Sequence, residues 1–340
     1  MSGYEEVFNT MNNTSDTDIQ REKINDFYLI LFEGIFILPT VFGNGLLLCS
    51  ICTHKTLRSR SNTLVANLAI SDFLIGGTAL PSDVITKILS EAKKDKFVCL
   101  LHNAFFVGFV GASVLNLFFI SLERYSAIMS PLKYYTNASR TSPVVSVTTV
   151  WIVSISLGIV PLLGWNSWQP GVLCKSEFVY FKGYIDLVLT LYIALIITSI
   201  ILYVIVVRKI LKQIQYYEKG RAGHNGRVSI NGNYDSFTFK NIKKTKIMIF
   251  VLGVFAFCWA PFTILTILKA YFISESRIVT ILGSYFAALG LLNSGLNWIV
   301  FGLLNNSMRK AFKDVLLCSY NRKMTVSTVS SNSNAVNTTC

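Results

Sequence analysis

The sequence predicts an all-α protein in which seven helices cross a membrane as a bundle, followed by an amphipathic helix on the inner membrane face. Three observations support this prediction. Of the 340 residues, 52% are hydrophobic and only 14% are charged, whereas about a quarter of the residues of a soluble protein are charged. Seven apolar stretches are each long enough to span a bilayer, for which about 20 residues suffice. Lysine and arginine are almost absent from these stretches and lie between them.

The chain begins with an acidic, polar segment, residues 1–27, which lacks the apolar core of a cleavable signal peptide. Asn12 and Asn13 in this segment begin glycosylation sequons, which are modified only in extracellular segments. The predicted membrane domain, residues 28–304, has spans at about 28–53, 63–89, 97–129, 143–165, 183–212, 241–272 and 277–303. Because seven spans place the chain ends on opposite sides, we expect a multi-pass protein of the plasma membrane with an extracellular N-terminus and a cytoplasmic C-terminus.

The net charge of +13 is distributed unevenly along the chain. Basic residues gather in the segments 55–60, 208–246 and 309–322, which lie between or after the spans. This distribution follows the positive-inside rule for cytoplasmic loops. Basic and aromatic residues are not interleaved on a soluble domain, so we expect no nucleic-acid partner. The segment of about 213–240 is rich in Gly and Asn and is predicted to be a flexible linker.

Two segments follow the seventh span. Residues 305–318 predict an amphipathic helix in contact with membrane lipid, because basic residues alternate with apolar ones at helical spacing, namely Met308, Phe312, Val315 and Leu316. Cys318 at its end is a candidate for palmitoylation, and an ordinary buried cysteine fits the sequence equally well. Residues 319–340 are rich in Ser, Thr and Asn and are predicted to be a disordered cytoplasmic tail.

Asp72 is a carboxylate in the middle of the second span. A charge at that depth must face the bundle interior and find a partner. Converging oxygen atoms around one buried charge suit a hard cation, and a protonated Asp72 in a hydrogen-bond network without an ion fits the same residues. The polar residues predicted at similar depth are Asn44, Ser113, Asn293, Ser294 and Asn297.

The third span ends in Glu123-Arg124-Tyr125. An arginine at the centre of a bilayer costs about 2.5–3.5 kcal/mol even on lenient insertion scales. We therefore expect the charged pair at the membrane–water boundary, where a partner protein can reach it.

These residues belong to an ordered set of motifs that resembles the rhodopsin-like (class A) G-protein-coupled receptors over residues 28–318. The matching motifs, in chain order, are Gly43-Asn44, Leu68 with Asp72, Glu123-Arg124-Tyr125, Trp151, Tyr203, Cys258-Trp259-Ala260-Pro261 and Asn293-Ser294-Gly295-Leu296-Asn297. Within the family, the motifs are most similar to those of the adenosine, lysophospholipid and cannabinoid receptors.

The resemblance implies a cell-surface receptor that binds an extracellular ligand and activates a heterotrimeric G protein when the sixth helix moves outward. The residues that would couple to the G protein are Glu123, Arg124, Tyr125 and the loop residue Leu132. A sodium ion, as an allosteric ligand and not a cofactor, would stabilise the resting state in a pocket formed by Asp72, Ser113, Asn293 and Asn297.

The resemblance also assigns a switch and a disulfide. The switch would consist of Trp259, Pro261, Phe255 and Tyr203, of which Pro261 removes a helix hydrogen bond and makes a kink suited to a two-state motion. Cys99 and Cys174 would form a disulfide in the oxidising exterior. Ser and Thr residues of the tail are candidates for phosphorylation by a receptor kinase and recruitment of arrestin, and an unmodified polar tail is the alternative.

The sequence departs from the family at three places. Asn297-Trp298-Ile299-Val300-Phe301 replaces the usual Asn-Pro-x-x-Tyr, so the proline kink and the tyrosine hydroxyl are both missing. Leu195 stands where the fifth helix usually has proline, and Asn241 where many members keep an acid that locks the arginine. Without that acid the resting state loses a charge-assisted hydrogen bond of about 1.5–3 kcal/mol. We therefore hypothesise appreciable basal activity, which ligand-free signalling no higher than that of vector alone would contradict.

The sequence says less about the identity of the ligand than about the class of receptor. Aminergic members need an Asp on the outer third helix, where this chain has Phe105-Phe106, so an amine is not expected. The aromatic, nearly uncharged wall favours a lipid or a small neutral molecule, although such aromatics often serve packing alone. His102-Asn103 and Thr266 replace the ligand-binding residues of lysosphingolipid and adenosine receptors, so neither ligand is carried over. The residues expected to line the pocket are His102, Phe105, Phe106, Phe109, Trp259, Phe262 and Thr266.

Three other functions were compared with the receptor. An enzyme is not expected, because the histidines lack metal-ligand spacing and a paired nucleophile. A transporter or an ion or proton channel could use Asp72, but it would not need Glu123-Arg124-Tyr125 at the end of the third span. The third alternative is a receptor that no longer couples to a G protein, and the replacements Trp298 and Phe301 are the reason to keep it.

Overall fold

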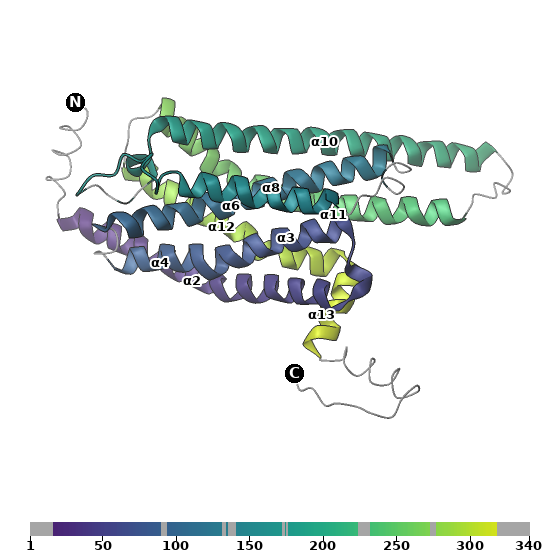
Figure 1. The fold of residues 1–340 in the computed structure, drawn as a ribbon, viewed down its shortest axis with the longest axis horizontal. Helices are drawn as coiled ribbons and strands as arrows, with labels where there is room; N and C mark the ends of the chain where they lie inside the picture. The colour runs from purple at the N-terminus through teal and green to yellow at the C-terminus, as the bar shows by residue number, and fades with distance from the viewer. Residues whose placement is uncertain are drawn as a thin grey trace.

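The computed structural model describes residues 16–89, 94–130, 134, 141–171, 174, 176–223, 232–272 and 277–317. The membrane helices lie side by side along one axis (Figure 1), and no strand occurs among the described residues, so the prediction of an all-α bundle is confirmed. In chain order the elements are α2 (Asp16–Thr53), η1 (Lys55–Leu57), α3 (Arg60–Leu74), η2 (Ile75–Ala79), α4 (Leu80–Ile88), α6 (Lys96–Met129), α8 (Thr141–Ile159), α9 (Ser176–Val179), α10 (Lys182–Gly223), α11 (Gly232–Tyr271), α12 (Arg277–Leu304) and α13 (Asn306–Leu316). We call the end of the bundle that contains Cys99 the outer end and the end that contains Arg124 the inner end.

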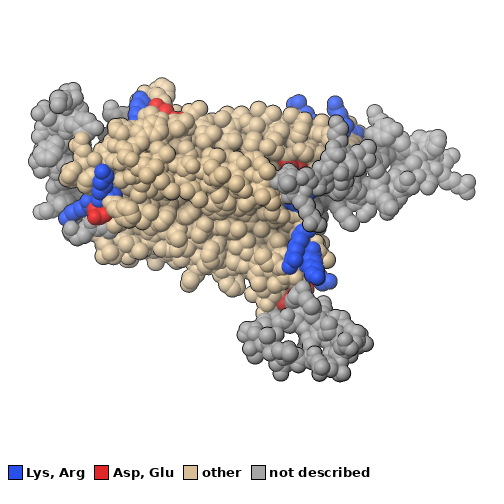
Figure 2. Space-filling model, viewed as in Figure 1, with Lys and Arg blue, Asp and Glu red and all other residues tan. Residues whose placement is uncertain are grey.

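The bundle has the surface of a multi-pass membrane protein. Six helical stretches among the described residues are long and apolar enough to cross a membrane. A shorter apolar stretch, Pro143–Ile159 in α8, corresponds to the predicted fourth span and brings the bundle to seven helices. On the face drawn in Figure 2, the charged side chains lie toward the two ends and the middle is covered by uncharged residues. Leu38 and Phe257 are 77% and 74% exposed on this surface. Large apolar surfaces of this kind are unfavourable in water and are expected where lipid covers a protein.

The second span is built from three elements because a proline interrupts its hydrogen bonds. Pro81 has no N–H to donate to the carbonyl of Gly77, four residues earlier. The preceding turn, η2, widens to a π-helix in which the N–H of Leu80 donates to the carbonyl of Ile75. Gly76 in this turn allows close packing on α2, since a Cβ atom there would lie 2.9 Å from the side chain of Thr40. The turn therefore sets the direction in which α4 presents its polar side chains.

The helices at the inner end are longer than predicted. The segment of about 213–240 was expected to be a linker, but α10 continues to Gly223 and α11 already begins at Gly232. Both project beyond their neighbours in Figure 1. The prediction was wrong here because this segment contains no proline, and adding a residue to an existing helix avoids the unfavourable nucleation step. Residues 224–231 lie outside the described part of the chain.

The predicted amphipathic helix is present as α13. It buries Met308, Ala311 and Phe312 and packs on α2 and α12. The side chain of Asn305 caps it by accepting hydrogen bonds from the N–H groups of the second and third residues, at 3.1 and 3.4 Å. At the other end of the chain, α2 begins at Asp16, before the span predicted from residue 28. The predicted sites at Asn12, Asn13, Leu132 and Cys318, and the tail 319–340, lie outside the described residues.

Candidate functional site

A cavity of about 480 Å³ opens between the outer parts of α6, α10, α11 and α12. Phe105 and Phe109, which were predicted for the pocket, do not line it, and their rings stack on each other with centroids 5.7 Å apart. Each residue turns an α-helix by about 100°, so neighbours such as Phe105 and Phe106 face different directions. The predicted pocket residues that do line the cavity are His102, Phe106, Trp259, Phe262 and Thr266.

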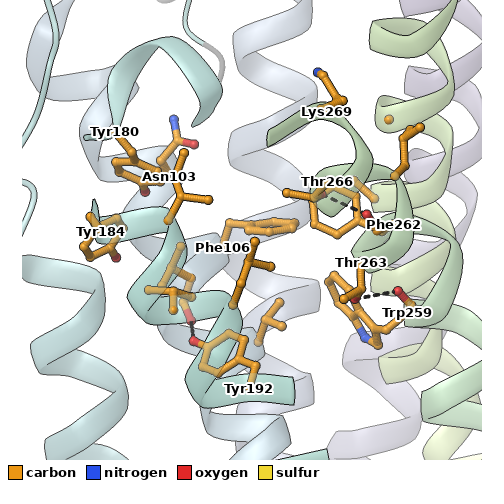
Figure 3. Close-up of a pocket in the computed structure, with 18 of the residues that line it drawn as sticks. Asn103, Phe106, Tyr180, Tyr184, Tyr192, Trp259, Phe262, Thr263, Thr266 and Lys269 are labelled. Atoms are coloured by element: carbon orange, nitrogen blue, oxygen red, sulfur yellow. Dashed lines mark hydrogen bonds between the residues drawn. The ribbon is translucent and has the colours of Figure 1, made fainter. Parts of the chain in front are cut away.

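Three aromatic rings form the floor of the cavity (Figure 3). The centroid of the Phe106 ring lies 5.9 Å from that of Trp259 and 6.1 Å from that of Phe262, and the latter two are 5.9 Å apart. These separations are typical of favourable edge-to-face contacts. Beneath them, the ring of the buried Phe255 lies 6.1 Å from Trp259. Since Trp259 is within one turn of Pro261, a molecule on this floor would contact α11 close to its proline.

The outer end of the cavity is held by a disulfide. Cys99 at the start of α6 is bonded to Cys174, with Cα atoms 5.6 Å apart, which confirms the predicted pair. Nearby, Tyr180 is buried on the cavity wall, and its hydroxyl has no hydrogen-bond partner among the described residues. Burial raises the pKa of Tyr180 well above its usual range. Its hydroxyl therefore stays protonated and can donate a hydrogen bond.

Asp72 lies at the centre of a polar layer between α3, α6 and α12, and none of its surface is exposed. One carboxylate oxygen accepts a hydrogen bond from the Asn297 amide at 2.8 Å, and the other accepts from the Ser113 hydroxyl at 3.3 Å. The side-chain oxygens of Asn293 and Asn297 are buried and have no hydrogen-bond partner among the described residues. Carboxylate, hydroxyl and amide oxygens are the ligands that hard cations prefer. The predicted sodium-pocket residues thus fit such an ion.

Arg124, only 3% exposed, lies at the inner end of α6. Its guanidinium is paired with Glu123, whose carboxylate also accepts a hydrogen bond from the hydroxyl of Tyr134. Tyr125 packs against the apolar side chains of α10, and Tyr203 on α10 is buried. A partner protein could therefore reach Arg124 only after the surrounding helices move.

The comparisons with known proteins agree with this geometry. Residues 43–301 match the family described as 7 transmembrane receptor (rhodopsin family). The chain belongs to this family. The receptor is 29% identical to the histamine H2 receptor of Cavia porcellus over 292 residues, which cover 84% of this chain and 78% of the relative. It is 24% identical over 384 residues to the 5-hydroxytryptamine receptor 1A-alpha of Takifugu rubripes, covering 86% and 88% of the two chains.

A third relative is the alpha-1A adrenergic receptor of Rattus norvegicus, which is 28% identical over 314 residues, with 84% of this receptor and 67% of the relative covered. Family membership confirms the resemblance found in the motifs, and it supports neither the enzyme nor the transporter or channel alternative. The first two of these relatives are named for amines, whereas the motifs indicated adenosine, lysophospholipid and cannabinoid receptors. The expectation against an amine ligand is therefore not supported by these relatives.

The receptor also contains a charged cluster near its outer end that the sequence did not predict. Lys87 on α4 lies with its Nζ 2.6 Å from a carboxylate oxygen of Glu33 on α2 and 2.8 Å from one of Asp83. The Nε2 of His102 is 3.7 Å from Asp83, and its Nδ1 is 3.1 Å from the hydroxyl of Ser82. Charged residues at i and i+4 inside an apolar stretch are the signal that could have indicated this cluster.

Trp298, which replaces the usual proline of the seventh helix, packs against α2. A Cβ atom on Gly43 would lie 2.2 Å from the indole ring, so the absence of a side chain at Gly43 is what admits the ring. The indole N–H is buried without a hydrogen-bond partner among the described residues. This contact joins α12 to α2 next to the Asp72 layer.

Proposed function

We propose that this G-protein-coupled receptor binds its extracellular ligand in the outer cavity and activates a heterotrimeric G protein at the inner end, through outward motion of α11. The position of Trp259 carries the proposal, because its ring belongs to the cavity floor and also contacts the buried Phe255. A ligand that displaces this ring changes the packing of α11 within one turn of Pro261, where the helix lacks a backbone hydrogen bond. Arg124 then becomes accessible when the inner part of α11 moves away.

The proposed ligand is a lipid or small molecule whose body is mainly apolar and uncharged. The aromatic floor supports this choice, as does Phe106 on the part of α6 that faces the cavity. An amine is the second candidate, because relatives of the receptor are named for histamine and 5-hydroxytryptamine. The two candidates differ in charge: the first has an uncharged body, whereas an amine carries a positive charge that the cavity would have to accept.

The polar layer around Asp72 is proposed to bind sodium when the receptor is at rest. The buried side-chain oxygens of Asn293 and Asn297, which have no hydrogen-bond partner among the residues that the structure describes, support this role, because an ion would supply a contact to them. We place the receptor in the plasma membrane with its outer end outside the cell, supported by the basic segments at the inner end. Arrestin and a receptor kinase are proposed partners of the Ser- and Thr-rich tail.

The test uses the full chain in lipid nanodiscs with a panel of purified G proteins. Guanine-nucleotide exchange is measured without ligand and with amines, nucleosides, lipids and aromatic acids. Arg124→Gln should lower exchange about tenfold or more, since it removes the charged group proposed to meet the G protein. Arg309→Gln, on the surface of α13, is the matched control and should retain exchange.

Trp259→Ala should abolish the response to ligand while leaving ligand-free exchange in place. Full exchange by Arg124→Gln would contradict the coupling role. Absence of exchange by the folded wild-type receptor with every G protein would instead support a receptor that has lost coupling.

A further inference from the structure

A buried hydroxyl on the cavity wall lacks a hydrogen-bond partner. Tyr180 lines the cavity and is only 5% exposed, and its phenolic oxygen has no partner among the described residues. The ring is held in place, because it packs in the same apolar cluster as Cys99 and Cys174 and its centroid lies 4.7 Å from that of Tyr184. Buried polar groups in proteins are nearly always paired, and each exception calls for an explanation. A ligand in the cavity would supply the missing partner.

Neighbouring hydroxyls on the cavity wall are already engaged. Those of Thr263 and Thr266 donate to carbonyls of their own helix at 2.9 and 2.8 Å. Those of Tyr184 and Tyr192 donate to backbone carbonyls of α8 and α6 at 2.7 and 2.8 Å. A ligand could bind one of these four hydroxyls only if the protein gave up an existing contact. Tyr180 can donate its O–H to a ligand without such a loss.

The surroundings of the Tyr180 hydroxyl favour an uncharged acceptor. The titratable groups that act on this hydroxyl are those of Tyr184 and Tyr192, and tyrosines are neutral at physiological pH. An anion bound to Tyr180 would therefore be buried without a counter-charge beside it, which is costly. An ammonium ion has no lone pair with which to accept the O–H. A carbonyl oxygen accepts it and brings no donor that would need a partner of its own.

We propose that the ligand carries an uncharged carbonyl group whose oxygen accepts a hydrogen bond from Tyr180, while its apolar body lies on the three aromatic rings of the cavity floor. Phe106 of that floor packs against the apolar cluster that contains Tyr180, so one molecule can contact both. In Figure 3, Tyr180 and Trp259 lie on opposite sides of the cavity. The inference rests on the proposed function, since it takes this cavity to be the ligand site.

The experiment measures the affinity of matched probes for the full receptor in nanodiscs of uncharged lipid. One series has a naphthyl body and ends in a methyl ketone, an isopropenyl group, a carboxylate or an ammonium group; a second series has a decyl chain and the same four ends. The isopropenyl group has the shape of the ketone and cannot accept a comparable hydrogen bond. The ketones should bind about tenfold tighter than the isopropenyl probes, and both charged ends should bind less tightly than the ketones.

Two conservative variants then locate the hydrogen bond. Tyr180→Phe should remove the tenfold preference for ketones and leave the affinity for the isopropenyl probes unchanged. Tyr184→Phe is the matched control, because it removes a hydroxyl from the same apolar cluster and should keep the preference. Thermal unfolding without a probe gives a second readout. Tyr180→Phe should unfold at or above the wild-type temperature, since its hydroxyl is unpaired, whereas Tyr184→Phe loses a hydrogen bond and should unfold at a lower one.

The inference is overturned if ketones and isopropenyl probes bind equally, if a charged end binds best, if the ketone preference survives in Tyr180→Phe, or if no probe of either series binds. The proposed function is judged separately, because Phe106→Ala should weaken ketone and isopropenyl probes alike when the cavity is the site. Isopropenyl binding that depends on Phe106 without any ketone preference would retain the cavity and reject the hydrogen bond. Binding that Phe106→Ala leaves unchanged would reject the cavity itself.

Discussion

Two groups of polar side chains around buried carboxylates in the described bundle differ in what faces the negative charge. The inner group surrounds Asp72 with hydroxyl and amide side chains, all of them neutral. The outer group places Glu33 and Asp83 on the ammonium of Lys87. A lone carboxylate among neutral ligands attracts a cation from outside the protein, whereas carboxylates with their own cation hold helices together. The inner group is therefore suited to regulation by an ion, and the outer group to fixing α4 against α2.

The largest expected effect on stability comes from removing the charge of Lys87, which tests the outer group. Lys87→Met leaves two neighbouring carboxylates without their cation in a buried site, where Glu33 is only 2% exposed. Breaking a buried pair in this way costs about 3–5 kcal/mol of unfolding free energy. The measurement is denaturation of the purified receptor, with Lys87→Arg as the charge-preserving control. Equal stability of Lys87→Met and wild type would show that the outer group does not hold the helices.

Replacement of Asp72 tests the inner group. In the wild type, exchanging sodium for choline should lower stability, by about 1.4 kcal/mol when sodium is in tenfold excess over its dissociation constant. Asp72→Asn keeps the size of the side chain and removes its charge, so its stability should no longer depend on sodium. Lys87→Arg, in the outer group, should retain the full sodium effect. A sodium effect that persists in Asp72→Asn would reject the proposed ion site.

The smallest expected effects separate the two groups most finely. Ser113→Ala and Ser82→Ala each remove one hydroxyl, the first beside Asp72 and the second beside His102. Each should cost about 0.5–1.5 kcal/mol of unfolding free energy. Only Ser113→Ala should also weaken the dependence of stability on sodium. An equal loss of that dependence in Ser82→Ala would mean that the two groups are coupled.

The two groups also show what sequence reasoning can reach. Asp72 was found because a charge in the middle of a span has few explanations, and the motifs around it occur in a fixed order. The outer group was missed because Glu33 and Lys87 are 54 positions apart, and nothing in the sequence specifies how α2 and α4 are rotated toward each other. The π-turn before Pro81 contributes to that rotation, and neither hydropathy nor spacing predicts it.

The rotation of α6 about its axis also explains why Phe105 and Phe109 were wrongly predicted to line the pocket. The aromatic run Phe105-Phe106 indicated an aromatic wall, but only the helix register decides which ring faces the cavity. The disulfide was predicted from the resemblance to the receptor family, with Cys99 at the start of the third span and Cys174 in the loop before the fifth, both on the outer side. The inner extensions of α10 and α11 were not predicted, because the many Gly and Asn residues of this segment were taken as the sign of a linker. These residues lower helix stability, but they do not end a helix.

Trp298 has a mechanical consequence. Pro261 leaves one carbonyl of α11 without its usual partner, and that helix has a local point of low bending stiffness. α12 contains no proline, so it has no comparable joint between Thr280 and Ser284, which line the cavity, and its inner end beside α13. A displacement of its outer end would therefore move α12 as a rigid unit, and the contact between the Trp298 ring and Gly43 would be the point about which the helix turns.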